Sequence, residues 1–311
     1  FTFMNFARLG TGQQGLAHAE LSFQNSLAYA RDRLQMRSLS GQKNPAGPAD
    51  TIIVHPDVRR MLLTQKAFAE GARALVYFAS TQGDILTKSE DPEARDLANH
   101  VLNFMTPIIK AFLTDTGFES ANLGLQWFGG QGYINDWGVE QNVRDPRIAM
   151  LYEGTTGVQA LDLLGRKVLG TRGEALAPVT GFILDFCKRS RSRKELRPYL
   201  KTLVRLTKQW KSLTRKIGFA AMRDRDAVGA ASVDYIMFSG YVLLGVAWAA
   251  SARAAYNRLE QGTSEEAFYR AKIQTAEFYF AKILPRTTSL LELISAGPDS
   301  LMTMDEDEFI F

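Results

Sequence analysis

Residues 126–159 read QWFGGQGYINDWGVEQNVRDPRIAMLYEGTTGVQ and contain two turns marked by glycines. The first turn is GGQG at 129–132. The second is YEGTT at 152–156, and it opens onto an apolar run that ends at Leu169. Glycine adopts positive φ angles and lets the backbone approach a ligand or another backbone closely. The two turns therefore indicate tight backbone geometry on both sides of a short polar segment.

Glu153 lies at an unusual place for a solvent-exposed charge, because it follows the apolar run 148–151 and precedes Gly154. Thr155 or Thr156 can cap the helix that follows, and a helix N-terminus favours an anion. A carboxylate in apolar surroundings can serve as a general base near neutral pH. The alternative is a loop glutamate beside a threonine cap, which is a common arrangement. The residues alone leave both interpretations open.

Helical periodicity surrounds this stretch. Apolar residues recur at steps of three, four and seven over about 5–36, 57–86 and 92–128, and again from Thr155 onward. Glycines at 10, 12 and 15 would weaken an isolated helix, so we expect close packing there. Residues 38–56 have the composition of a loop. Four long helices with few strand signals predict an all-α fold built on an antiparallel four-helix bundle.

Gly170–Gly173 is the predicted domain boundary, which divides the chain into a bundle over 1–170 and a second helical bundle over 171–311. We expect the second domain to have helices at about 174–189, 193–223, 226–261 and 264–296. Tyr235 to Ala252 is eighteen residues without a charge, near the lower limit for a membrane span. Because charges bracket it and small residues are frequent in it, we interpret it as a buried bundle helix, with a membrane span as the alternative.

The composition excludes several classes of site. The 311 residues carry a net charge of +4 and one cysteine, Cys187, so an internal disulfide is excluded. His18, His55 and His100 are too dispersed to predict a zinc site, and no metal is expected. The N-terminus shows no signal-peptide pattern, and its helical pattern begins at once, so we expect a fragment of a longer protein.

Residues 188–216 form a basic amphipathic segment with twelve lysines and arginines. Its simplest interpretation is a solvated bundle face. A surface that docks on a membrane or a protein partner is the second interpretation. Nucleic acid is not expected, because no pattern of base-stacking aromatic residues accompanies the charge.

Three motifs together suggest a family. They occur in order, as Gln126-x-x-Gly129-Gly130-x-Gly132-Tyr133, then Arg144-Asp145-x-Arg147-Ile148, then Tyr152-Glu153-Gly154-Thr155. With these motifs, residues 1–170 resemble the acyl-CoA dehydrogenase family. The remaining residues resemble the additional C-terminal helical domain of long bacterial members, a group that includes the methylthiopropionyl-CoA dehydrogenases.

The resemblance implies an oxidoreductase that acts on CH–CH bonds: an FAD-dependent enzyme that removes two hydrogens from an acyl-CoA thioester in fatty-acid β-oxidation. In the family pattern Glu153 is the base that takes the α proton, and FAD accepts the β hydrogen as hydride. Tyr152 and Gly154 fall in the substrate-binding turn. Arg8 matches an arginine near the CoA part of the substrate.

The resemblance also implies an incomplete site. Arg33, Gln126 and Gly130 match residues that contact the flavin of a neighbouring subunit, and Thr155 matches a further flavin contact. A homodimer or a dimer of dimers is therefore expected. The family's N-terminal helical domain and middle β domain are missing from this chain, and they are expected as partners together with an electron-transfer acceptor.

Two other functions stay open at this level. The first is that the chain is a non-catalytic helical assembly module. The second is that it is a basic module that docks on a membrane surface. The expected location is the cytoplasm, with peripheral attachment to the inner membrane as the alternative.

Overall fold

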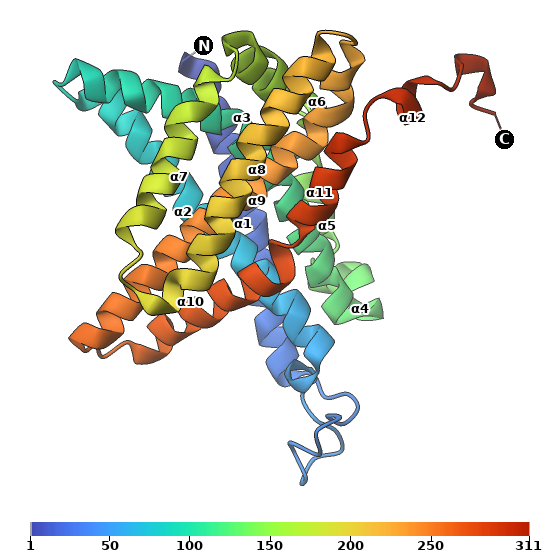
Figure 1. Cartoon of the computed structure of the whole chain (residues 1–311). Coiled ribbons are helices and arrows are strands. Elements are labelled where there is room, and N and C mark those ends of the chain that lie inside the picture. The colour runs from blue at the N-terminus through green and yellow to red at the C-terminus, as the bar shows by residue number, and fades with distance from the viewer. Residues whose placement is uncertain (1, 311) are drawn as a thin grey trace.

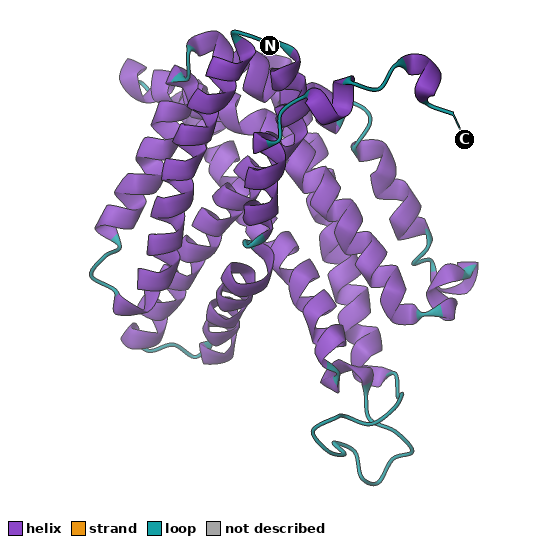
Figure 2. Cartoon of the chain, turned by 45° about the vertical axis from the view of Figure 1, so that its right-hand side comes forward, coloured by secondary structure: helices purple, strands orange, loops and turns teal. Residues whose placement is uncertain are grey.

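The computed structural model describes residues 2–310 and their side chains from Phe3 onward. Every regular element in this range is a helix, as Figure 2 shows, and the predicted all-α class is confirmed. The long helices are α1 (Thr2–Asp32), α2 (Pro56–Lys88), α3 (Pro92–Phe128), α7 (Ala177–Arg189), α8 (Arg197–Ala221), α9 (Asp226–Gln261), α10 (Glu266–Phe278) and α11 (Arg286–Ser295).

Shorter elements connect the long ones. The short α-helices are α4 (Gly130–Tyr133), α5 (Gln141–Ala149), α6 (Thr156–Leu161) and α12 (Asp299–Met302). The 3₁₀ turns are η1 (Ile52–Val54), η2 (Asn135–Trp137), η4 (Leu169–Thr171), η5 (Glu174–Leu176), η6 (Lys194–Leu196) and η8 (Glu306–Glu308). Two segments are π-helical, η3 (Asp162–Val168) and η7 (Tyr279–Ile283).

Helices α1 and α3 run parallel and pack with their backbones in direct contact. A Cβ atom added to Gly15 would lie 2.2 Å from the carbonyl oxygen of Leu113, and one added to Gly117 would lie 2.4 Å from the carbonyl oxygen of Gly15. At Gly12 the nearest atom would be Cγ2 of Ile109, at 2.7 Å. Gly12 and Gly15 therefore allow the close packing that the sequence predicted, whereas Gly10, the third glycine of that prediction, has nothing within 4 Å of an added Cβ atom.

Helix α9 runs through the centre of the molecule (Figure 1) and packs against α2, α3, α6, α8, α10 and α11. It is long and apolar enough to cross a membrane, but 78% of its most apolar window is buried inside the protein. Trp248 at its middle donates a hydrogen bond to the carbonyl oxygen of Ala67 in α2, at 3.0 Å. The structure thus places the charge-free stretch in the core, and one hydrophobic cluster joins residues of both predicted domains.

Two of the predicted helix boundaries were wrong. The first helix ends at Asp32, and Met36 has a positive φ of 59°, because residues 33–55 form a loop organised around buried Asp50. The carboxylate of Asp50 accepts hydrogen bonds from the backbone N–H groups of Ser38, Lys43 and Asn44, and these lower its pKa to about 2. The helix predicted over 264–296 continues from α10 through the π-helical η7 and is interrupted at Leu284–Pro285, before α11. Within η7 the buried Tyr279 hydroxyl donates to the carbonyl oxygen of Tyr241 at 2.7 Å.

Replacing Gly117 with Ala should lower the free energy of unfolding by about 1–3 kcal/mol, because the new methyl group would overlap the backbone of α1. The matched control is Gly10→Ala. Gly10 is exposed on α1, and a Cβ atom added there would have nothing within 4 Å, so this change should stabilise the helix by about 0.5–1 kcal/mol. Urea denaturation followed by circular dichroism measures both, and equal effects of the two changes would contradict the close contact.

Candidate functional site

The turn that carries Glu153 has an unusual backbone. Glu153 has a φ of 58° and Gly154 a φ of 90°, so two consecutive residues lie in the left-handed region. A non-glycine residue in this region is strained, which is frequent at functional sites. A Cβ atom at Gly154 would lie 2.8 Å from Nε2 of Gln159, so glycine is required there. Thr155 caps α6 by accepting a hydrogen bond from the N–H of Val158, as one of the two predicted caps.

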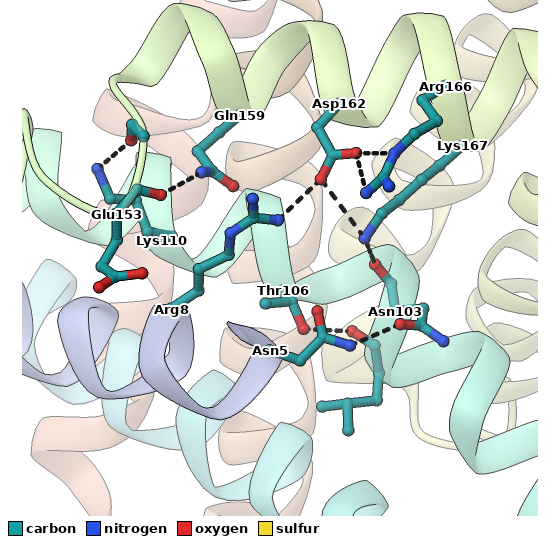
Figure 3. A network of polar contacts seen from close by, with 12 residues as sticks. Asn5, Arg8, Asn103, Thr106, Lys110, Glu153, Gln159, Asp162, Arg166 and Lys167 are labelled. Carbon is teal, nitrogen blue, oxygen red and sulfur yellow. Dashed lines mark hydrogen bonds and ion pairs between the residues drawn. The ribbon is translucent and has the colours of Figure 1, made fainter. Parts of the chain in front are cut away.

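Two fully buried side chains hold this turn in place. Nζ of Lys110, in α3, donates to the carbonyl oxygen of Gly154 at 2.6 Å. Nε2 of Gln159, in α6, donates to the carbonyl oxygen of Glu153 at 2.8 Å. Figure 3 shows both contacts converging on the turn from opposite sides. The backbone that presents the Glu153 carboxylate is therefore fixed by the bundle core.

A second carboxylate lies behind the turn. Burial raises the pKa of Asp115 to about 6, although Thr156 donates a hydrogen bond to it at 3.2 Å and Lys110 attracts it. Burial also lowers the pKa of Lys110, while the carboxylates of Asp115 and Glu153 act in the opposite direction. Lys110 thus interacts with two acids as well as with the backbone, and it couples Asp115 electrostatically to Glu153.

Arg8 reaches the same region from α1. Its Nη1 atom pairs with Oδ2 of Asp162 at 2.9 Å, and Nε of Arg166 donates to the other oxygen of Asp162 at 2.5 Å. Nζ of Lys167 lies 3.8 Å from Asp162 and donates to the carbonyl oxygen of Asn103, and burial lowers the pKa of Lys167 to about 8. Asp162 therefore gathers three cations at the start of the π-helical segment η3, and this cluster orients Arg8.

Three buried polar atoms of this site have no hydrogen-bond partner within residues 2–310. They are Oε2 of Glu153, Nε of Arg8 and Oε1 of Gln159. Buried polar atoms are nearly always satisfied in folded proteins, so each exception needs an explanation, and a bound ligand is one. A carboxylate oxygen, a guanidinium N–H and an amide oxygen are suited to contact a polar ligand, so this region is the candidate site.

The remaining predicted residues lie far from the turn. Arg33 follows the end of α1, Gln126 lies in the last turn of α3, and Gly130 begins α4; all three are exposed. Sixteen residues of α3 separate Lys110 from Gln126, which corresponds to about 24 Å along the helix. Within one chain these residues therefore form a second group at the other end of the bundle. Tyr152 stays at the turn, where its hydroxyl donates to Oε1 of Gln14.

Several residues of the site were not predicted from the sequence: Lys110, Asp115, Gln159, Asp162 and Lys167. Lys110 carried a visible signal, because it interrupts the apolar run of α3 at a position that the helical period assigns to the core. The other four residues gave no such signal, because each of them contacts a group that is distant in the sequence or that exists only in the folded turn.

Fold and site together define an α-helical domain that presents a half-buried glutamate on a left-handed turn held by the core. Residues 1–169 match the family model for the acyl-CoA dehydrogenase C-terminal domain, and residues 179–305 match the model described as acetyl-CoA dehydrogenase C-terminal like. The chain therefore belongs to the acyl-CoA dehydrogenase family, as its three motifs predicted.

Curated relatives extend the match across the whole chain. The 3-methylmercaptopropionyl-CoA dehydrogenase of Ruegeria pomeroyi is 36% identical over 310 residues, which cover 97% of this chain and 51% of the relative. The broad-specificity linear acyl-CoA dehydrogenase FadE5 of Mycobacterium tuberculosis is 32% identical over 318 residues, which cover 99% and 52%. The chain thus spans about half the length of these relatives.

Solved structures agree on the fold. Caenorhabditis elegans ACDH-11 in complex with C11-CoA superposes with a TM-score of 0.67 at 19% identity, over 90% of this chain and 43% of that one. The acyl-CoA dehydrogenase of Bacillus anthracis complexed with FAD gives 0.60 at 16% identity, over 95% and 47%. Both similarities cover helices on each side of the predicted domain boundary.

Changing Asp115 to Asn should alter how stability depends on pH. The pKa of Asp115 is raised from 3.8 to about 6 in the folded protein, so folding favours the protonated form. The contribution of this carboxyl to the free energy of unfolding therefore falls by up to about 3 kcal/mol as pH rises from about 4 to about 6. It stays low above about pH 6. The free-energy difference between Asp115→Asn and wild type should grow in favour of the variant across this window.

Chemical denaturation at pH 4, 5, 6 and 7 measures the effect. The exposed Asp145→Asn change removes a carboxylate elsewhere and is the control. A constant difference between Asp115→Asn and wild type at all four pH values would contradict the raised pKa.

Proposed function

We propose that this chain is the C-terminal part of a flavin-dependent acyl-CoA dehydrogenase in which Glu153 removes the α proton of an acyl-CoA thioester. One observation carries the proposal: the Glu153 carboxylate has a buried oxygen without a partner, on a turn fixed by Lys110 and Gln159. The names of the relatives, which include acyl-CoA dehydrogenases of two bacteria, support the same reaction.

The geometry of the turn supports a catalytic role for Glu153. A general base must be held close to the proton it takes, and the hydrogen bonds to the carbonyl oxygens of Glu153 and Gly154 hold the backbone that carries this carboxylate. In the reaction the carboxylate gains the α proton, and the β hydrogen leaves with its electron pair. In this proposal the backbone N–H of Glu153 would help to polarise the thioester carbonyl.

FAD fits the residues of this chain as a group shared between subunits. When bound, it supplies the hydride acceptor. Thr155 would contact it from beside the base, whereas Arg33, Gln126 and Gly130 lie at the opposite end of the bundle. One flavin cannot contact both groups of a single copy, so the second group would serve a neighbouring copy in a homodimer or a dimer of dimers.

The same site accounts for the proposed substrate. Arg8 has a buried N–H without a partner and belongs to a cluster of cations, so it suits the anionic CoA portion. Ile148, Leu151 and Val158 are exposed apolar side chains around the turn, which the missing domains and the acyl chain would cover. A place in fatty-acid β-oxidation, an electron-transfer acceptor and a cytoplasmic location complete the proposal.

Replacing Glu153 with Gln should slow reduction of the flavin by saturating acyl-CoA by a factor of about 10²–10⁴, because the side chain keeps its shape and loses the base. Stopped-flow bleaching of flavin absorbance in the complete enzyme measures this rate, and FAD content should stay unchanged. Glu140→Gln is the control for loss of a nearby acid. A Glu153→Gln enzyme within a few-fold of wild type would place the base elsewhere, and a wild-type protein that never bleaches would favour the non-catalytic module.

Replacing Arg33 with Ala should weaken FAD binding by about 1.5–3 kcal/mol, because a charge-assisted contact to the flavin pyrophosphate is lost across the subunit interface. The neighbouring exposed Arg31→Ala change is the matched control. Fluorescence titration of apo-enzyme with FAD gives the affinity, and analytical ultracentrifugation verifies that assembly is intact. An unchanged affinity in a correctly assembled Arg33→Ala protein would contradict the assignment.

A further inference from the structure

Helix α8 carries more than half of the positive charge of the basic segment 188–216. It has seven of the 37 basic residues and none of the 33 acidic ones, so the remainder of the chain is net acidic. All seven cations are exposed: Arg197, Lys201, Arg205, Lys208, Lys211, Arg215 and Lys216. Helix α8 therefore carries seven cations without an acid, and it continues the basic run that begins at Lys188.

The seven cations form one stripe, which we call the α8 basic face. Their spacings of mostly three and four residues keep them on one side of the helix over about 28 Å. The opposite side is buried against the bundle through Leu203, Leu206, Trp210, Leu213 and Ile217. The face is therefore rigid, straight and directed outward, and α8 lies on the outer surface of the molecule in Figure 1.

None of the seven cations pairs with a carboxylate within residues 2–310. The only side-chain hydrogen bond they make there is from Arg205 to the amide oxygen of Gln209, at 3.1 Å. Other exposed helices of this chain neutralise their charges with pairs four residues apart, such as Lys88 with Asp84 and Arg270 with Glu266. The charge of the α8 basic face is thus left for a partner outside this chain.

Two apolar side chains continue the same stripe at its C-terminal end. Phe219 is 66% exposed and Met222 is 74% exposed, and both fall on the side of the helix that carries the cations. Exposed apolar groups in line with a row of cations suit a surface that offers phosphates and, beneath them, hydrocarbon.

We propose that the α8 basic face docks on an anionic lipid bilayer, with Phe219 and Met222 inserted at the level of the headgroups. A second copy of this chain is a poor partner for this face, because the seven cations of one copy would repel the seven cations of the other. Nucleic acid offers phosphates but no apolar layer for Met222. A bilayer supplies both, and a rigid stripe of this length can contact many headgroups at once. This inference does not depend on the proposed catalytic reaction.

The strength of the interaction can be estimated from the charges. Each lysine or arginine close to an anionic membrane contributes about 1 kcal/mol. Replacing three of them with glutamine should therefore weaken partitioning about a hundred-fold. Glutamine is a good helix former, so these exposed changes leave the fold intact. Added salt should weaken binding by screening the charges.

The experiment uses the whole purified protein and co-sedimentation with vesicles of phosphatidylcholine, alone or mixed with phosphatidylglycerol. The test variant combines Lys201→Gln, Arg205→Gln and Lys208→Gln. The control combines Lys43→Gln, Lys88→Gln and Arg95→Gln, which removes the same net charge from exposed positions elsewhere. A third variant, Phe219→Ser with Met222→Ser, keeps the charge and removes the apolar contacts.

The proposal predicts that wild type and control bind the anionic vesicles and not the neutral ones. The α8 triple variant should bind about a hundred-fold more weakly, and the Phe219/Met222 variant should lose the part of binding that resists salt. Equal weakening of the control and the α8 variant would overturn the proposal, as would absence of wild-type binding to anionic vesicles. Unchanged vesicle binding by the α8 variant, with an altered oligomeric state in ultracentrifugation, would assign the face to a protein contact instead.

Discussion

The backbone contact between α1 and α3 is the constraint on which the site depends. Gly15 and Gly117 let the two helices approach until a single added methyl group would overlap a carbonyl oxygen. Arg8 extends from the first of these helices and Lys110 from the second, so their separation is set by this contact. Because Arg8 is paired with Asp162 and Lys110 is bonded to the turn, the packing of two glycines helps to place the charges around a carboxylate that lies elsewhere in the sequence.

The turn itself is stable only because the core supports it. A left-handed non-glycine residue costs about 1–3 kcal/mol, and burying Lys110 adds a desolvation cost that lowers its pKa. The hydrogen bonds from Lys110 and Gln159 to consecutive carbonyl groups offset part of this, at about 0.5–3 kcal/mol each. A lysine is suited to this position because its charge also interacts with Asp115 and Glu153. The same side chain therefore holds the turn and sets the electrostatic environment of the carboxylate.

Local sequence features predicted much of the fold. The glycines of α1 predicted close packing, Thr155 predicted the start of α6, and the charge-free stretch of α9 predicted a core helix. Features that depend on tertiary contacts were not predictable. The end of α1 depends on the Asp50 loop that closes against it. The break before α11 did have a local signal, because Pro285 disfavours a continuous helix. Lys110 was visible as a charge within an apolar run, but its role was not predictable, because its partner, the carbonyl oxygen of Gly154, lies 44 residues away and is recognisable only in the folded turn.

The burial of α9 explains why α8 is free to carry so much charge. Helix α9 is buried on nearly all sides and supplies most of the apolar surface on which the helices after residue 170 pack. Helix α8 therefore needs only one apolar stripe to pack against it. The rest of its circumference carries no packing requirement, and a solvated helix surface would ordinarily mix both signs of charge. Selection for solubility alone gives no reason to exclude every acid from 25 residues, or to leave Phe219 and Met222 exposed in line with the cations. The one-sided composition of α8 is therefore better explained by an external anionic surface than by the stability of the fold.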